Sequence, residues 1–272
     1  MEQLSTQPKN TNRGAQLFAN PLVRKLSKIQ ETSTEKASYA GIAHKCFFFM
    51  AMILCGIALA LLLHNLPPFV LTEATDGMSM TLSEVIAGGI SLVLFILTPI
   101  IAFLIRPAIP VAGALYCIST GVVLTLLGNL VPEYRELIFL ALVLTIAVVV
   151  AMQILYSSGK IKVTQKFRTI VITLFLASIL GSLLLFVCMF IPGLSGAAMM
   201  IANNQILGIV FSIIGIIIAS LFLLVDFNTI QESISRGLPK KYEWMGAFTL
   251  TFSVIWLYFK ILELLIRLKD SK

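Results

Sequence analysis

The stretch ILGIVFSIIGIIIASLFLLVD, residues 206–226, decides the class of this protein. It runs from Ile206 to Val225 without a charged residue, and an α-helix of this length crosses about 30 Å of hydrocarbon at about 1.5 Å per residue. It then closes on Asp226. A carboxylate at or inside a bilayer costs about 3 kcal/mol, so Asp226 is either a functional residue or a solvated one at the boundary of lipid and water. The stretch itself leaves both interpretations open.

The whole chain has the composition of an integral membrane protein. Of its 272 residues, 58% are hydrophobic and 12% are charged, and the mean hydropathy is +0.97. Soluble domains carry about 25% charged residues. The net charge of +7 does not indicate nucleic-acid binding, because the basic residues are spread over several loops rather than gathered in one aromatic-studded patch.

Apolar segments along the chain predict an all-α, polytopic bundle of about seven transmembrane helices. Strands of a membrane barrel would be shorter and would alternate apolar with polar residues. The predicted domains are a flexible cytoplasmic tail, residues 1–42, and a seven-helix transmembrane domain, residues 43–272. The predicted spans are about 46–64, 84–104, 108–130, 136–156, 169–191, 206–227 and 245–266.

The loop charges predict a cytoplasmic amino terminus. Lys and Arg of short loops are held on the cytoplasmic side, and the loops of the opposite side hold Arg135 alone. One conflict remains, because seven crossings place Arg267, Lys269 and Lys272 outside. Either these charges are too weak to overrule the earlier helices, or the seventh segment does not fully cross. The residues that set the orientation lie in the tail and in the second, fourth and sixth connections: Lys9, Arg13, Arg24, Lys25, Lys28, Lys36, Lys45, Arg106, Lys160, Lys162, Lys166, Arg168, Arg236, Lys240 and Lys241.

We expect no cofactor, no metal site and no enzymatic activity. The cysteines fall in apolar spans at spacings that match no zinc or redox motif, and His44 and His64 are too few for a His-rich site. The segment GLSG, residues 193–196, resembles the GxSG of rhomboid intramembrane proteases, where a histidine on another helix activates the serine. Here His64 would have to serve Ser195, although the rhomboid histidine follows its serine. A Gly/Ser turn between two helices is the favoured interpretation.

The remaining polar features lie near the carboxyl end. After Asp226 the sequence keeps an amphipathic helical pattern until Gly237 and Pro239, so the sixth helix is expected to run past the membrane. Lys260 and Glu263 share one face of the seventh helix, where they can neutralise each other. Alternatively, Lys260 snorkels outward and Glu263 lies in the outer headgroups.

These last helices carry a resemblance to a known family. Residues 221–268, LFLLVDFNTIQESISRGLPKKYEWMGAFTLTFSVIWLYFKILELLIRL, resemble the carboxyl-terminal signature of the Bax inhibitor-1/YccA superfamily, in which an aspartate closes the sixth helix. YSSGKIKVTQKFRTIVI at 156–172, ASYAGIAHKCFFF at 37–49 and the early FANPLVRK are similar to a bacterial YccA/Bax-inhibitor-like subgroup. Together these motifs cover most of the chain.

The resemblance implies a seven-helix membrane protein whose relatives are pH-sensitive calcium leak channels or regulators of stress survival and membrane proteases. In those relatives, two carboxylates on the last two helices share a proton and latch the pore. Asp226 matches the first carboxylate, and Lys260 stands where the second is expected. An ion pair between Asp226 and Lys260 would keep Asp226 ionised, and it would repel a divalent cation. Glu263 lies three residues beyond Lys260 in the seventh helix and so still farther from Asp226. The role of the second carboxylate therefore does not transfer to it.

Helix geometry also separates the two residues. If the antiparallel helices turn near Pro239, Asp226 lies opposite about Phe252, and Lys260 lies about 12 Å deeper at about 1.5 Å per residue. Direct contact would need a broken helix or an altered turn.

Two functions therefore stay open. The chain is either an ion (calcium) leak channel, with Asp226 at the pore latch and Lys260 and Glu263 modulating the ion path, or a non-conducting regulator that binds a membrane protease or another membrane protein. The expected partners are the lipid bilayer, calcium or protons, or a second membrane protein, and not nucleic acid. The bacterial subgroup suggests the cytoplasmic (inner) membrane.

Overall fold

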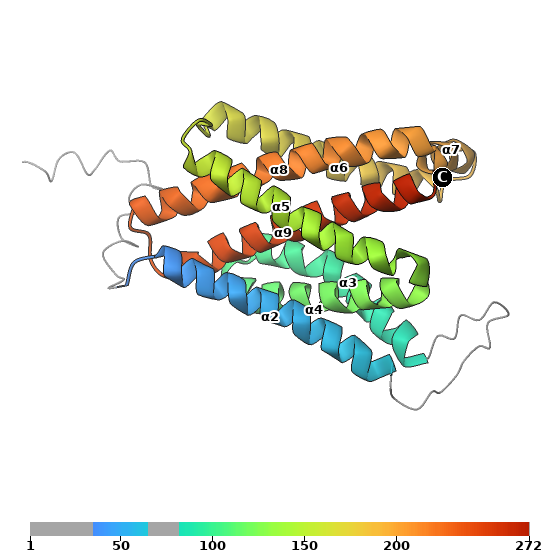
Figure 1. The fold of residues 1–272 in the computed structure, drawn as a ribbon, viewed down its shortest axis with the longest axis horizontal. Coiled ribbons are helices and arrows are strands. Elements are labelled where there is room, and N and C mark those ends of the chain that lie inside the picture. Colours follow the sequence, from blue (N-terminus) through green and yellow to red (C-terminus); the bar gives the residue numbers. More distant parts are fainter. Residues whose placement is uncertain (1–34, 65–81, 272) are drawn as a thin grey trace, which may run out of the picture.

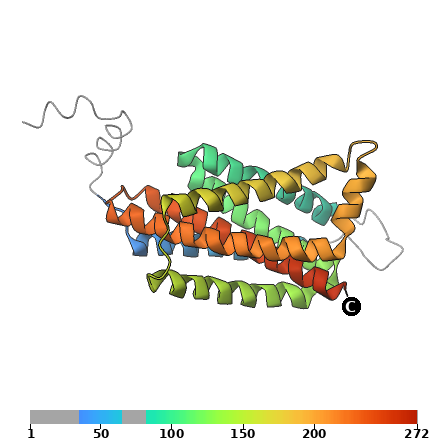
Figure 2. The same ribbon diagram turned by 90° about the horizontal axis from the view of Figure 1, so that it is seen from above.

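The structure is a computed structural model that describes residues 35–64 and 82–271. Most of this part of the chain is helical, and the helices lie side by side along one axis (Figures 1 and 2). The α-helices are α2 (Tyr39–His64), α3 (Leu82–Leu104), α4 (Ile109–Leu130), α5 (Arg135–Ser157), α6 (Gln165–Cys188), α7 (Ser195–Asn203), α8 (Gln205–Ser235) and α9 (Tyr242–Lys269). Short 3-10 turns at Arg106–Ala108 and Pro132–Tyr134 precede α4 and α5.

The predicted all-α fold is confirmed. Among the described residues, seven helices are long and apolar enough to cross a membrane, and they coincide with the predicted spans. Gly193, with φ of 90°, and Leu194 form the expected turn between α6 and α7, whereas Ser195 and Gly196 begin the short helix α7 instead of continuing the turn. His64, the histidine considered for Ser195, ends α2, and its side chain is outside the described part of the structure.

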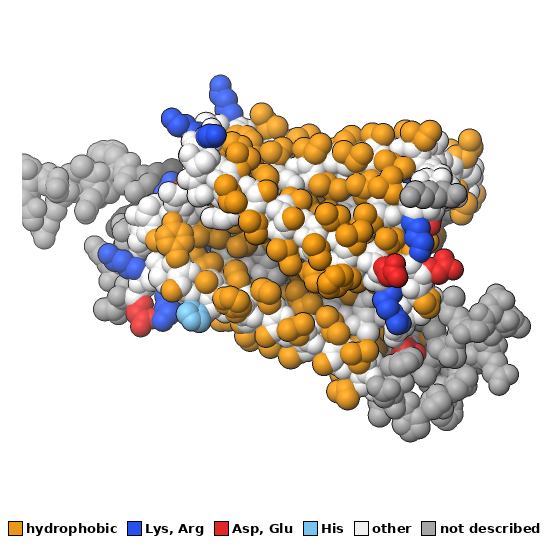
Figure 3. All heavy atoms as spheres, in the orientation of Figure 1, with side chains coloured by type: hydrophobic (Ala, Val, Ile, Leu, Met, Phe, Trp, Pro, Cys, Tyr) orange, Lys and Arg blue, Asp and Glu red, His pale blue; other side chains and the backbone are white. Residues whose placement is uncertain are grey.

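The centre of the bundle is formed by α4 and α9. α4 packs against α2 and α3, whereas α9 packs against α2, α5 and α8. Three aromatic rings join these helices in edge-to-face contacts: Phe248 lies 6.1 Å from Phe49 and 6.1 Å from Tyr116 between ring centroids. Many large apolar side chains, most of them on the other helices, stay exposed, and they form a broad belt on the face shown in Figure 3. A bilayer would cover such a belt.

Glycines bring α2 and α4 into backbone contact. A Cβ atom on Gly56 would lie 2.1 Å from the carbonyl oxygen of Ile118, and one on Gly121 would lie 2.2 Å from that of Ile53. Neither position has room for a side chain. Because lipid tails are as apolar as the helices, membrane helices associate through close packing of this kind.

α8 and α9 form a long antiparallel hairpin. The apolar run continues past Asp226 as helix to Ser235, which confirms the predicted extension of this helix. The chain then reverses at Gly237, whose φ of 61° favours glycine, and Pro239 follows. Buried apolar residues fill the seam between the two helices: Ala219, Leu223, Leu257, Ile261 and Leu262.

The two ends of the bundle carry different elements. The start of α2, the α5–α6 connection and the α8–α9 turn lie together at one end, on the left in Figure 1, which we name the basic end because it carries the Lys and Arg residues of those connections. The chain finishes at the opposite end, where Tyr134 donates a hydrogen bond to Asp270 and Lys269 donates to the carbonyl of Glu133. The seventh segment therefore runs the full length of the bundle. A cytoplasmic location of the basic end stays a prediction.

Candidate functional site

Asp226 faces the interior of the bundle. It lies on α8 in the seam with α9, and only 4% of its surface is exposed. The three residues that precede it, from Leu223 to Val225, are buried as well. The structure therefore places this carboxyl among packed helices rather than at the exposed boundary of the apolar belt.

The carboxyl of Asp226 is held by hydroxyl groups of α9. Ser253 donates a hydrogen bond from Oγ to Asp226 Oδ2 at 2.5 Å, and the Thr249 side chain is a second polar neighbour. Ser253 stands next to Phe252, the residue that helix geometry predicted to lie opposite Asp226. Ser253 is fully buried, so this hydrogen bond is shielded from water.

Ser253 has two acceptors within reach, and this suits both protonation states of Asp226. Its Oγ also lies 3.0 Å from the carbonyl oxygen of Thr249. An ionised Asp226 accepts the hydroxyl hydrogen of Ser253. A protonated Asp226 can instead donate to Ser253 Oγ, which then donates to the Thr249 carbonyl. A proton gained or lost at Asp226 would thus redirect a hydrogen-bonded chain inside the seam.

The charged side chains beyond this seam pair with one another. Arg168 of α6 donates to Thr229, one turn after Asp226, at 2.9 Å, and it lies 3.7 Å from the Glu232 carboxylate. Within the described part of the chain, no Lys, Arg or His side chain forms an ion pair with Asp226. The carboxyl is buried without a compensating cation.

Lys260 and Glu263 lie together, but far from Asp226. Lys260 Nζ donates to Glu263 Oε2 at 2.8 Å, and Arg267 reaches the other oxygen of the same carboxylate at 3.2 Å. The Lys260 side chain lies across Gly215 of α8, where an added Cβ would be 2.8 Å from its Cδ. Gly215 precedes Asp226 by about 16 Å at about 1.5 Å per residue of helix. Among the described residues, the seam near Asp226 therefore holds one carboxyl, whereas the relatives have a pair of carboxylates there. Asp226 and Lys260 do not form an ion pair.

A second buried carboxylate, Glu243, was not among the predicted site residues. It is 1% exposed at the start of α9, where Lys45 donates to Oε2 at 2.5 Å. The backbone N–H and the hydroxyl of Ser38 both donate to Oε1, at 2.9 and 3.2 Å. Gly41 gives the carboxylate room, since a Cβ there would lie 2.1 Å from Oε1. In the sequence, Glu243 stands between two aromatic residues and resembles an ordinary interface residue. The charge of Lys45 at the edge of the first span was the one available signal.

The residues before α2 are attached to the α8–α9 turn. Ala37 donates its N–H to the carbonyl of Leu238 at 2.7 Å, and the N–H of Lys240 donates to the carbonyl of Glu35 at 3.1 Å. The Glu35 carboxylate also accepts from Lys240 Nζ at 2.8 Å and raises the pKa of that amine. Of the predicted flexible tail, residues 1–34 lie outside the described residues, and residues 35–38 run along this turn.

Comparison with known proteins identifies a family that the chain matches. A family model described as Bax inhibitor 1 like matches residues 17–270, which include all seven candidate spans and Asp226. No curated protein and no solved structure matches the chain. The narrower YccA-like subgroup stays a prediction.

Proposed function

The chain belongs to the Bax inhibitor 1 like family, and we propose that it is an ion leak whose closed state is held by the contact between Asp226 and Ser253. It is a multi-pass membrane protein with seven apolar helices. We place it in the bacterial cytoplasmic membrane, with the basic end in the cytoplasm.

The observation that supports this proposal is a buried carboxyl that forms no ion pair with any Lys, Arg or His of the described residues. Asp226 lies between the two longest helices of the bundle, and hydroxyl groups hold it there. An ionised carboxylate is more stable where water can reach it, so ionisation favours separation of α8 and α9 at this point. Protonation favours the packed seam. The single group thus links an opening of the bundle to pH.

The charges further along α9 bear on the choice of ion. Lys260 and Arg267 share one carboxylate, Glu263, so this part of α9 carries a net positive charge. Calcium takes about 6–8 oxygen ligands, and within the described residues no group of three or more His, Cys, Asp or Glu could hold a metal. We therefore expect a leak of protons or monovalent cations to exceed a leak of calcium.

Replacement of Asp226 by Asn tests the latch. The full chain is reconstituted in liposomes that contain a pH, potassium or calcium dye, and flux is measured at about pH 6 and about pH 8, because the ionised form of the carboxyl is the one that favours opening. We expect the wild type to leak more at the higher pH. Asp226→Asn keeps the shape but cannot ionise, so its leak should be low and independent of pH.

A matched variant separates the latch from a general loss of charge. Asp270→Asn removes the carboxylate that Tyr134 contacts at the opposite end, and it should keep the pH dependence of the wild type. Absence of flux for every dye at both pH values, unaltered by Asp226→Asn, would exclude the leak.

The second candidate function is a non-conducting regulator that binds another membrane protein. It is favoured by Lys260, which pairs with Glu263 where the resemblance led us to expect a second latch carboxylate. Folded protein that conducts nothing in the liposome experiment would support this candidate. We expect no enzymatic activity under either proposal.

A further inference from the structure

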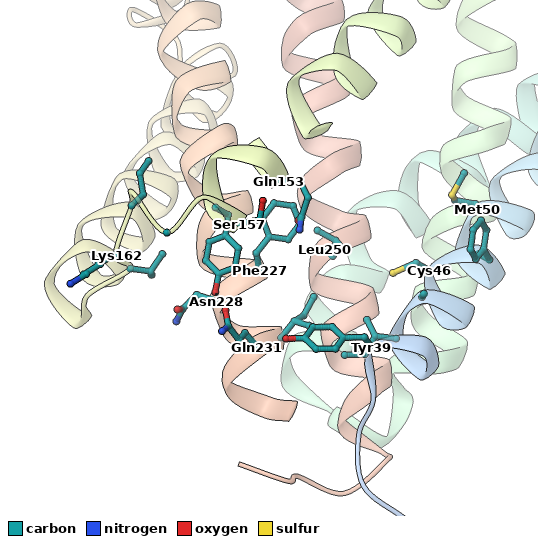
Figure 4. Close-up of a pocket in the computed structure, with 18 residues that line it drawn as sticks. Tyr39, Cys46, Met50, Gln153, Ser157, Lys162, Phe227, Asn228, Gln231 and Leu250 are labelled. Atoms are coloured by element: carbon teal, nitrogen blue, oxygen red, sulfur yellow. Dashed lines mark hydrogen bonds between the residues drawn. The ribbon is translucent and has the colours of Figure 1, made fainter. Parts of the chain in front are cut away.

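A side-open cavity lies between α2 and α5, at the basic end of the bundle (Figure 4). Its volume is about 880 Å³, which is within the range of about 300–1,000 Å³ that ligand sites occupy. α8 and α9 contribute Phe227 and Leu250 to its wall, and the α5–α6 connection contributes Lys162. The ion-leak proposal does not involve this cavity.

The cavity changes character along the axis of the bundle. Tyr39 lies at the start of α2, near the basic end, whereas Met50 lies about 16 Å deeper at about 1.5 Å per residue. Leu250 lies less deep, eight residues or about 12 Å into α9 at about 1.5 Å per residue. Apolar side chains line the deeper part: Cys46, Phe47, Met50, Phe227 and Leu250. Most of the polar side chains lie toward the basic end, whereas Gln153 lies as deep as Met50 (Figure 4). The polar residues toward the basic end are Tyr39, Tyr156, Ser157, Lys162, Asn228 and Gln231, and the apolar Ile42, Ile161, Val163 and Ile230 lie among them.

The polar part is built by contacts between helices. Tyr156 of α5 donates a hydrogen bond to Gln231 of α8, which joins the two walls. Gly159, with φ of 68°, turns the chain after α5, and the connection that follows places Lys162 at the edge of the cavity, with its amine directed outward (Figure 4). None of the described residues that line the cavity is acidic, and Lys160 lies in the same connection. The charge at this end of the cavity is therefore positive.

We propose that this cavity binds one anionic phospholipid of the leaflet at the basic end, with its headgroup at Lys162 and an acyl chain against Met50 and Leu250. A phospholipid is polar at the membrane surface and apolar beneath it, and most of the polar side chains of the cavity likewise lie toward the basic end. α2 and α5 each pack on α9, and the opening between them faces the exposed apolar belt, so a lipid enters sideways. Anionic headgroups are attracted to lysines at the membrane surface.

Native mass spectrometry of the full chain in detergent tests this site. The protein is titrated with phosphatidylglycerol or with phosphatidylcholine that has the same acyl chains. We expect the wild type to bind phosphatidylglycerol about fivefold more tightly, because one lysine contributes about that factor toward an anionic headgroup. Lys162→Gln should abolish the preference. Ala43→Trp fills the cavity next to α2, between Tyr39 and Cys46, and should weaken the binding of both lipids.

Lys166→Gln is the matched control, since Lys166 lies in the first turn of α6 and does not line the cavity. This variant should keep the preference for phosphatidylglycerol. Equal affinity for the two lipids, or an equal loss in Lys162→Gln and Lys166→Gln, would overturn the proposal, because surface charge alone would then explain the binding.

A photo-crosslinking residue at Met50 identifies the occupant in native membranes. A lipid adduct is the expected result. An adduct to a second copy of the chain, or to another polypeptide, would show that the opening between α2 and α5 is a protein interface and would contradict the lipid site.

Discussion

Gly121→Leu is expected to lower the free energy of unfolding by about 3 kcal/mol or more, since overpacking against backbone cannot be relieved by a change of rotamer. A side chain at this position meets the carbonyl oxygen of Ile53 and the backbone nitrogen of Ile57 on α2. α2 and α4 would have to move apart, and the aromatic contacts around Phe49 would be lost with them. The measurement is the midpoint of thermal unfolding in detergent, together with the yield of monodisperse protein.

Gly181→Leu is the matched control for this prediction. Gly181 also lies inside an apolar span, on α6, and a Cβ there meets nothing within 4 Å. The control should melt close to the wild type. If both variants melt alike, the close approach of α2 and α4 does not limit the stability of the bundle.

Glu243→Ala is expected to cost about 3–5 kcal/mol, because loss of one partner leaves the other charge of a buried pair uncompensated. Lys45 has a side chain that is 14% exposed, and it would lose its carboxylate. Both donors of Ser38 would also lose their acceptor. Glu243→Gln keeps the shape and one acceptor oxygen, so its loss should be smaller.

The same thermal unfolding experiment checks this order of stabilities. Glu136→Ala removes an exposed carboxylate from the first turn of α5 and should change stability by less than about 0.5 kcal/mol. If Glu243→Ala is as stable as Glu136→Ala, the ion pair with Lys45 contributes nothing to the fold.

Most of the fold was predictable, because the length of an apolar run is almost sufficient by itself to identify a membrane-spanning helix. Counting residues on both sides of the turn placed Asp226 opposite Phe252, one residue from its actual partner, Ser253. An antiparallel hairpin with a turn near Pro239 fixes which residues face each other. Two interpretations of Lys260 and Glu263 were left open, and the ion pair at 2.8 Å agrees with the one in which they neutralise each other on one helix face.

The features that the sequence did not reveal depend on contacts between distant segments. Glu243 pairs with Lys45 across 198 positions, and no local pattern indicates such a partner. The helix α7 has only nine residues, too few to cross a membrane, so its residues were assigned to the connection between two spans. The cavity is a gap between α2 and α5, and a gap depends on how helices are placed rather than on the residues of either one.

The attachment of α2 to the beginning of α9 has a consequence for the order of assembly during synthesis. α2 can pack on α4 early, because α3 is the only long helix that the structure describes between them in the chain. Lys45 pairs with the carboxylate of Glu243, which is synthesised 198 residues later. The turn that residues 35–38 contact is also synthesised about that late. Domains assemble from the amino terminus as they leave the ribosome. A nascent chain therefore carries an unpaired Lys45 through most of its insertion, and the arrival of the final helix completes both ends of the bundle at once.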